Sequence, residues 1–256
     1  MQRLKIDSQK VERKLVRFIR DQVRKAAYDK VVLGLSGGLD SSIVAYLCCR
    51  ALGPENVIGL ILPYKTTSRK SIKLARLIAD KYGIKTKTVS ITVQVDIYFR
   101  SFPGADRVRR GNKMARERMS ILYDQSKASN ALVAGTGNKT ECLLGYSTIY
   151  GDAACAFNPL GGLYKTQLRQ FAKDVGIPKE IIRQTPTAGL WPGQSDEGEL
   201  GVSYAKVDRL LYYLVDKKYS EKRLRNLGFS QAFIDKVKRM VAANRFKMCT
   251  PAIARI

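Results

Sequence analysis

The stretch Val31-Val-Leu-Gly-Leu-Ser-Gly-Gly-Leu-Asp-Ser-Ser42 decides the fold, because an apolar run meets a glycine turn at its carboxyl end. Residues 31–35 predict a buried strand, and the apolar run Ile43-Val-Ala-Tyr-Leu47 predicts a buried helix after the turn. Gly37 and Gly38 let the backbone approach an anion closely, and the free amides of a helix amino end favour negative charge. The stretch therefore predicts a phosphate-binding loop between a strand and a helix.

This loop differs from the common Walker loop, in which a lysine follows the last glycine. Asp40 stands there instead. An acid beside a phosphate-binding loop repels its ligand unless a cation lies between them, so Asp40 implies magnesium. A simpler alternative is an ordinary turn with Asp40 as a helix cap. The strand before the turn and the helix after it favour the phosphate-binding loop.

The segment Ser36-Gly-Gly-Leu-Asp-Ser41 resembles the pyrophosphate-binding loop of the ATP pyrophosphatases. The resemblance implies that the chain cleaves ATP to AMP and pyrophosphate. This superfamily contains synthetases for NAD, GMP, asparagine and arginine precursors, and also tRNA-modifying enzymes. The loop alone does not choose among them.

Length and composition narrow the class of protein. A chain of 256 residues suits one α/β domain with appendages. No apolar run approaches the roughly 20 residues of a membrane span, and residues 1–7 lack a secretory core, so we expect a cytoplasmic protein. The absence of histidine excludes Ser-His-Asp and Cys-His catalysis and histidine-ligated metal sites. The five cysteines form no C-x-x-C pair, and we expect them to be free and buried.

The formal charge of +24 is unevenly distributed. Residues 100–118 contain seven Lys or Arg against two acids, and residues 236–256 contain six against none. Such a field attracts polyanions, which include tRNA as well as dinucleotides and ATP. A solvated basic surface without a nucleic-acid role is equally compatible with these counts.

Strand and helix patterns alternate along the chain. Strands are predicted at 31–35, 57–62, 86–93 and 131–135, and helices at 9–28, 41–52, 67–82, 113–129 and 165–176. This order predicts an α/β fold with a doubly wound, Rossmann-like parallel sheet and ligands outside the carboxyl ends of the strands. We expect a single domain, 1–256, made of an amino-terminal helix (1–28), an ATP-binding core (29–183), and a linker loop with carboxyl-terminal helices (184–256).

A second motif, Ala134-Gly-Thr-Gly-Asn-Lys-Thr-Glu141, follows the fourth predicted strand. In a doubly wound sheet this strand end can lie beside the first, which would bring Thr136 and Glu141 toward the same ligand. Glu141 could then share a magnesium ion with Asp40, since Mg²⁺ is usually bound by one or two carboxylates together with phosphates. The alternative is that Glu141 only complements a helix dipole.

Five segments together resemble the NAD synthetases, in an order and spacing that agree over nearly the whole chain. The last of them carries the most specific pattern, Trp-x-Gly-Gln-x-Asp-Glu. The resemblance also implies the adenine nucleotide alpha-hydrolase-like fold. The segments are Gly34 to Ser41, Gly111-Asn-Lys-Met-Ala-Arg-Glu-Arg-Met119, Gly135-Thr-Gly-Asn-Lys-Thr-Glu141 with Tyr150-Gly-Asp152, Leu163-Tyr-Lys-Thr-Gln167, and Pro186-Thr-Ala-Gly-Leu-Trp-Pro-Gly-Gln-Ser-Asp-Glu197.

This resemblance implies a role for each matching residue. Asp40, Glu141 and Lys165 would be catalytic, and Asp40 and Glu141 would hold Mg²⁺. ATP would be bound by Gly34, Leu35, Ser36, Gly37, Gly38, Leu39, Asp40, Ser41, Thr136, Lys165 and Thr187. The second substrate, deamido-NAD+, would be bound by Asn112, Arg116, Asp152 and Lys247.

The implied reaction is the ammonia-dependent conversion of deamido-NAD+ to NAD+, the final step of NAD biosynthesis. A nicotinate carboxylate attacks the α-phosphate of ATP, and ammonia then displaces AMP. No protein nucleophile is needed, and catalysis is positioning plus charge stabilisation. The chain has no room for a glutaminase domain, so ammonia would arrive free or from a separate glutaminase. A homodimer is also implied, with helices 9–28 and 203–215 as candidate contacts.

The departures from the family pattern fall on the expected dinucleotide side. They are Ile149, Ala153, Ala154, Ala156 and Phe246. They leave open a related ligase that amidates another carboxylate. The charge of +24 leaves open a tRNA-modifying enzyme, which ranks third because no paired cysteines suit thiolation. We expect no membrane partner, and the basic stretch near Arg116 is interpreted as a dinucleotide site rather than a nucleic-acid groove.

Overall fold

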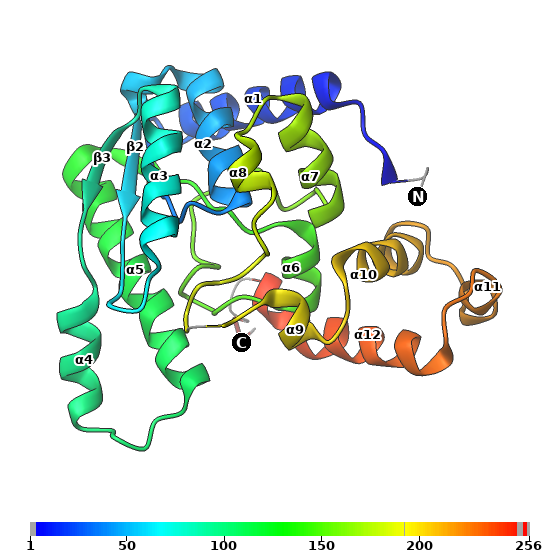
Figure 1. The fold of residues 1–256 in the computed structure, drawn as a ribbon. Coiled ribbons are helices and arrows are strands. Elements are labelled where there is room, and N and C mark those ends of the chain that lie inside the picture. Colours follow the sequence, from blue (N-terminus) through cyan, green and yellow to red (C-terminus); the bar gives the residue numbers. More distant parts are fainter. Residues whose placement is uncertain (1–3, 192, 250–252, 255–256) are drawn as a thin grey trace.

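The computed structural model describes residues 4–191, 193–249 and 253–254. Pro192, inside the segment that carries the most specific pattern, lies outside these ranges. Four parallel strands form one sheet in the order β3-β2-β1-β4. Figure 1 shows β3 and β2 side by side next to α3. They are β1 (Lys30–Gly34), β2 (Val57–Ile61), β3 (Lys85–Thr88) and β4 (Ala131–Val133). The strand β1 pairs with both β2 and β4, so its carboxyl end lies in the middle of the sheet edge at which ligands are expected to bind.

Helices cover both faces of the sheet, as predicted. The strand β1 directs Val31 and Leu33 into an apolar cluster with α1, α2, α3 and α7, and Val32 into a second cluster with α4 and α5. The helices are α1 (Ser8–Lys25), α2 (Leu39–Leu52), α3 (Arg69–Tyr82), α4 (Thr92–Arg100), α5 (Arg107–Ser129), α6 (Lys139–Leu144), α7 (Lys165–Asp174), α8 (Lys179–Ile182), α9 (Asp196–Leu200), α10 (Tyr204–Leu211), α11 (Glu221–Asn226) and α12 (Gln231–Asn244).

The predicted strand over 86–93 is partly wrong. The strand β3 ends at Thr88, and α4 begins at Thr92. The β-branched residues in this region suggested a longer strand, but burial of Ile91, Val95 and Phe99 at spacings of four residues favours one apolar helix side. Tertiary packing therefore overrides local β propensity here.

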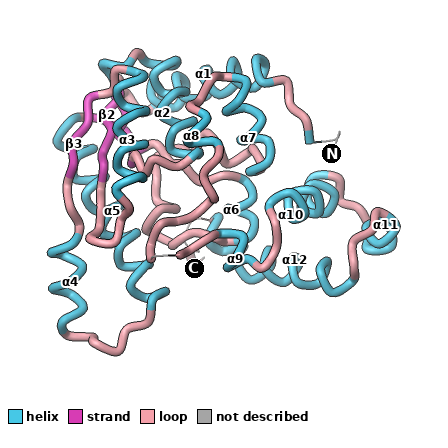
Figure 2. The backbone as a smooth tube through the Cα atoms, viewed as in Figure 1, coloured by secondary structure: helices cyan, strands magenta, loops and turns pink. Residues whose placement is uncertain are grey.

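The carboxyl-terminal helices form a separate apolar cluster with Leu144 and Tyr164. Leu144 is the last residue of α6, and Tyr164 directly precedes α7. The helix α10 continues as a π-helix, Tyr212–Asp216, and contacts both α6 and α7. Loop segments gather between the sheet and α9 in Figure 2. The cluster thus supports one side of the region in which these loops meet.

The apolar sides of the two candidate contact helices are used within the chain. In α1, Ile19 and Val23 are buried in the core, and in α10, Val207 and Leu210 are fully buried. None of the helices in the described part of the chain combines the length and the apolar character that crossing a membrane requires.

Candidate active site

The phosphate-binding loop joins β1 to α2. Gly37 has φ +77°, and a Cβ there would lie 2.2 Å from the carbonyl oxygen of Ser71. The position therefore requires glycine. The Oγ atoms of Ser36 and Ser41 lie 3.0 Å apart, and Ser42 donates to the carbonyl of Gly38 at 2.7 Å. These bonds hold the backbone turn at the amino end of α2, where its free amides can receive an anion.

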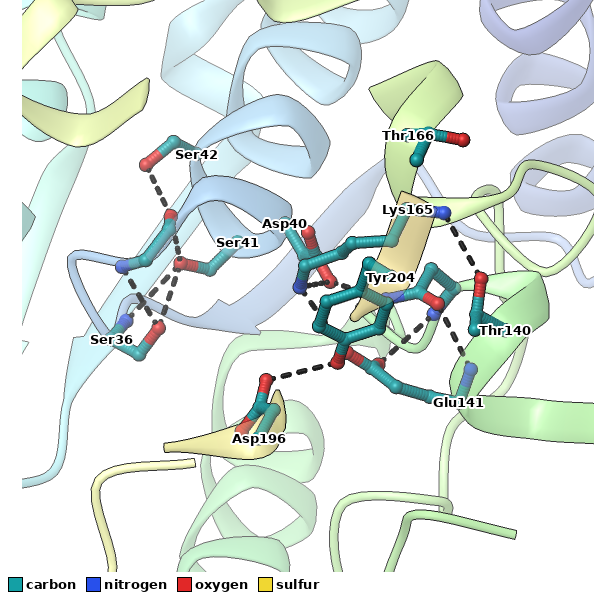
Figure 3. A network of polar contacts seen from close by, with 12 residues as sticks. Ser36, Asp40, Ser41, Ser42, Thr140, Glu141, Lys165, Thr166, Asp196 and Tyr204 are labelled. Atoms are coloured by element: carbon teal, nitrogen blue, oxygen red, sulfur yellow. Dashed lines mark hydrogen bonds and ion pairs between the residues drawn. The ribbon is translucent and has the colours of Figure 1, made fainter. Parts of the chain in front are cut away.

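The two predicted acids meet at one lysine, as Figure 3 shows. The Nζ atom of Lys165 lies 2.8 Å from Oδ2 of Asp40 and 3.2 Å from Oε1 of Glu141. Each of these three residues lies at the start of a helix. Asp40 is in the first turn of α2, Glu141 is in the first turn of α6, and Lys165 is the first residue of α7. The parallel order of β1 and β4 brings the first two helix starts to the same edge.

Asn138, which was not predicted as a site residue, links the two acids. Its Nδ2 donates to Oδ2 of Asp40 at 2.8 Å, and its Oδ1 accepts the N–H of Glu141 at 3.0 Å. Glu141 in turn accepts the N–H of Asn138, which completes a capping box. The Asn-x-x-Glu spacing ahead of a helix was the available signal.

Charge and burial shape the protonation of this cluster. Burial alone lowers the pKa of Lys165, but Asp40 and Glu141 together raise it above its ordinary value. Burial raises the pKa of Glu141, the charge of Lys165 opposes this effect, and the charge of Asp40 adds to it. Lys165, only 6 % exposed, is therefore a fixed cation at neutral pH.

A third acid, Asp196, is the first residue of α9. Its Oδ2 accepts the hydroxyl of Tyr204 at 3.0 Å, and Lys165 Nζ lies 5.5 Å from the centre of the Tyr204 ring (Figure 3). Asp196 lies within the predicted Trp-x-Gly-Gln-x-Asp-Glu pattern, but no role was assigned to it. Only the tertiary fold places the start of α9 beside the lysine.

The donor set suits a magnesium ion that also binds phosphate. The Oδ1 atom of Asp40 is buried and has no hydrogen-bond partner among the described residues, so it is available as a ligand. Within the described ranges no group of three or more Asp, Glu, Cys or His residues could hold a metal by itself. Two carboxylates completed by phosphate oxygens are the arrangement that Mg²⁺ prefers.

These side chains line one cavity of about 730 Å³, a size that accommodates a nucleotide. It contains most of the sequence-predicted residues from both substrate sites. The predicted residues that line it are Gly34, Leu35, Ser36, Gly38, Leu39, Asp40, Ser41, Asn112, Thr136, Glu141, Asp152, Lys165, Thr187 and Lys247.

Two predicted residues lie outside the cavity lining. Gly37 faces α3, and its carbonyl accepts from Gln184 at 3.0 Å. Arg116 is exposed and donates to the carbonyl of Ile149 at 3.4 Å. Arg118, which was not predicted, does line the cavity, and burial lowers its pKa to about 10. Arg116 and Arg118 are two positions apart on α5, so their helical phase decides which one faces inward.

The predicted dinucleotide residues converge on residues 145–152. Thr148 donates its hydroxyl to Asn112 at 2.7 Å and its N–H to Asp152 at 2.8 Å. Lys247 donates to the carbonyls of Gly145 and Ser147 at 2.8 and 3.1 Å. Residues 145–152 thus form the second side of the cavity. They are distant from the phosphate-binding loop in the sequence, but both segments line the same cavity.

The departures from the family pattern surround this second side. Ala154 lines the cavity, and the carbonyl of Ile149 holds Arg116. Ala153 and Ala156 are exposed, and Phe246 is 60 % exposed. Only Ala154 among them therefore reaches the cavity itself.

A parallel α/β sheet with a glycine loop, paired acids and a buried lysine at its carboxyl edge defines a nucleotide-binding protein of the α/β class. The sequence model of the family described as NAD synthase matches residues 11–251. The chain belongs to this family, and it has the adenine nucleotide alpha-hydrolase-like fold that the solved relatives share.

Individual relatives match this chain over almost its full length. The chain is 49 % identical to the NH(3)-dependent NAD(+) synthetase of Trichlorobacter lovleyi, with 100 % of this chain and 94 % of that protein covered. The NH3-dependent NAD synthetase of Campylobacter jejuni matches with a TM-score of 0.84 at 36 % identity, covering 98 % and 100 %. The NMN synthetase of Francisella tularensis matches with a TM-score of 0.87 at 29 % identity, covering 98 % and 100 %.

Proposed function

We propose that this chain is an ammonia-dependent NAD+ synthetase, a carbon–nitrogen ligase that forms NAD+ from deamido-NAD+ with release of AMP and pyrophosphate. The observation that carries the proposal is the cluster of Asp40, Glu141 and Lys165 beside the phosphate-binding loop, in a cavity of about 730 Å³. The names of the full-length relatives at 44–49 % identity support the same activity.

In the first step a nicotinate carboxylate oxygen bonds to the α-phosphorus of ATP, and the bond from that phosphorus to the pyrophosphate oxygen breaks. The amides of the loop at Gly38 would hold the phosphates, and Lys165 would stabilise the charge that develops on the departing pyrophosphate. In the second step the nitrogen of ammonia attacks the carbonyl carbon, AMP leaves, and the amide nitrogen loses a proton to solvent.

Magnesium would be held by Asp40 and Glu141 with the phosphates, where it would neutralise phosphate charge. Lys165 would keep its contact with one or both acids as the phosphates enter. Asn138 would keep Asp40 and Glu141 in a fixed relation, since it bonds to both. Thr136 and Thr187, which also line the cavity, would contact further parts of ATP.

The acceptor would lie along residues 145–152. Asn112, Asp152 and Lys247 would bind deamido-NAD+, and Arg116 would reach it from the rim of the cavity. The guanidinium of an arginine suits a phosphate or carboxylate because it can donate two parallel hydrogen bonds. Ammonia would be free or supplied by a separate glutaminase.

A homodimer in the cytoplasm is part of the proposal. Since the apolar sides of α1 and α10 are buried in the chain's own core, the exposed apolar residues of α4 and the turn after it are better candidates for the contact. These are Val93, Ile97, Tyr98 and Phe102. Light scattering of the purified protein tests the dimer, and an Ile97→Glu variant tests this surface.

The decisive experiment mixes purified protein, ATP, magnesium, ammonium and deamido-NAD+, and measures NAD+ and AMP. Equal amounts of the two products are expected, with none when magnesium is omitted. A parallel reaction with nicotinate mononucleotide tests the related ligase, because one solved relative is an NMN synthetase. A preference for that acceptor, or release of pyrophosphate only with tRNA, would contradict the proposal.

A further inference from the structure

A buried carboxylate outside the cavity touches the framework of the active site. Asp208 lies on α10, far along the chain from the phosphate-binding loop, and it is 0 % exposed. Its Oδ1 accepts the hydroxyl of Thr140 at 2.6 Å, and its Oδ2 accepts the N–H of Thr166 at 2.8 Å. Asp208 does not line the cavity, so it would not contact substrate.

Thr140 connects this carboxylate to a second helix. Its Oγ1 donates to Asp208 and accepts the N–H of Lys165 at 3.1 Å. Thr140 is also 0 % exposed, so water does not compete for these bonds. Figure 3 shows Thr140 of α6 beside the backbone of Lys165 at the start of α7. One hydroxyl and one carboxylate thus fix the start of α6 against the start of α7.

The two residues that Asp208 binds are sequence neighbours of the catalytic candidates. Thr140 precedes Glu141, and Thr166 follows Lys165. The distance of 3.2 Å between Lys165 Nζ and Glu141 Oε1 therefore depends on the same two helix starts that Asp208 joins. A shift of one helix start against the other would change this distance directly.

A purely structural role explains this carboxylate less well. Burial raises the pKa of Asp208, and the hydrogen bonds from Thr140 and Thr166 oppose that effect. Burying an acid costs free energy that an apolar residue of similar size would not cost, and the neighbouring residues Val207, Leu210 and Leu211 are apolar and fully buried. A polar contact at this one position fixes a geometry that apolar packing would leave free to slide.

We propose that Asp208 is a positioning residue of the reaction: through Thr140 and Thr166 it holds Glu141 and Lys165 at the separation that pyrophosphate departure requires. The inference rests on the proposed function, and it adds the carboxyl-terminal helices to the catalytic apparatus. Asp208 acts through the two helix starts rather than on the reacting atoms.

The test compares Asp208→Asn with Val207→Ala. Both changes lie in the same buried turn of α10, but Val207 makes none of these polar contacts. Asp208→Asn is expected to lower kcat about 100-fold with KM for ATP within about threefold, since a displacement of about 1 Å in a catalytic group costs this much. Val207→Ala is expected to lower the melting temperature but keep kcat within about twofold. Equal kcat values for Asp208→Asn and the parent would overturn the inference.

Thr140 provides an independent pair of variants if Asp208→Asn does not fold. Thr140→Ser keeps the hydroxyl and is expected to retain the parental kcat, whereas Thr140→Val loses the hydroxyl and is expected to lose about 100-fold. If Ser and Val variants show the same kcat, the hydroxyl bridge has no positioning role and the inference is wrong.

A Lys165→Ala background shows whether Asp208 acts through the lysine. In single-turnover reactions, adding Asp208→Asn to Lys165→Ala is expected to cost less than about threefold, because residues that act as a unit are not additive. A full additional 100-fold loss would contradict this route. All ratios are taken with whichever carboxylate acceptor the parent amidates, so the identity of the parent's product tests the proposed function separately.

Discussion

The ammonium group of Lys165 lies 2.8 Å from the carboxylate of Asp40, although 125 positions separate the two residues in the chain. Both are held at the amino ends of helices, and Glu141 completes the group at 3.2 Å. The contact joins the first turn of α2, which follows the first strand, to the start of α7, which follows the last strand.

The first prediction concerns Lys165. Lys165→Ala is expected to lower kcat by about 10²–10³, because a preorganised positive charge that stabilises a departing group contributes about this much. Steady-state kinetics of pyrophosphate release measures the effect. Lys173→Ala is the matched control, since Lys173 lies on the same helix and is exposed. Equal losses in the two variants would argue against a specific role for Lys165.

The second prediction concerns the backbone of the phosphate-binding loop. Gly37→Ala places a methyl group 2.2 Å from the carbonyl oxygen of Ser71 and forces a non-glycine residue to φ +77°. We expect the free energy of unfolding to fall by about 1–3 kcal/mol and the KM for ATP to rise about tenfold. Denaturant titration and initial rates measure the two effects.

Gly104→Ala is the control for this loop, because apart from Gly104 itself and its two chain neighbours no described heavy atom lies within 4 Å of the added Cβ. We expect its stability to stay within about 0.5 kcal/mol of the parent. A Gly37→Ala protein as stable and as active as the Gly104→Ala protein would refute the argument from backbone conformation.

The third prediction separates the two sides of the cavity. Lys247→Ala removes the donor to the carbonyls of Gly145 and Ser147 and should loosen residues 145–152. We expect the KM for deamido-NAD+ to rise about tenfold, while the KM for ATP stays within about twofold. Arg245→Ala, an exposed neighbouring change, serves as the control. A selective rise in the KM for ATP would reverse the assignment of the two sides.

The fourth prediction uses the cysteines, which are free as expected. The expectation that they are buried is correct for Cys48 alone, because three others are half-buried and Cys249 is exposed. The thiolate is the reactive form, and burial raises the pKa of Cys48 well above its ordinary value, so at pH 8 its thiol stays protonated. We expect iodoacetamide to label exposed Cys249 in the native protein and Cys48 only after denaturation. Peptide mass spectrometry distinguishes them. Rapid native labelling of Cys48 would show that this core opens readily.

The sequence predicted the parallel sheet and its four strands, with the third extended too far, because apolar runs and glycine turns are local signals. It placed Asp40 and Glu141 together because parallel order brings strand ends to one edge. It did not find Asp208, whose neighbours on α10 are apolar and whose partners lie on α6 and α7. It did not single out Arg118, which lines the cavity, because helical phase relative to a cavity depends on packing. Contacts between distant elements are therefore the part that a single sequence leaves undetermined.

The position of Lys165 between two acids has a consequence for the stability of this protein when magnesium is absent. The lysine already supplies the counter-charge that keeps Asp40 and Glu141 from repelling each other, so the pocket is assembled before nucleotide arrives. Chelation is thus expected to stop turnover and leave the melting temperature unchanged. A cell short of magnesium would retain an intact, idle protein that resumes work as soon as the ion returns.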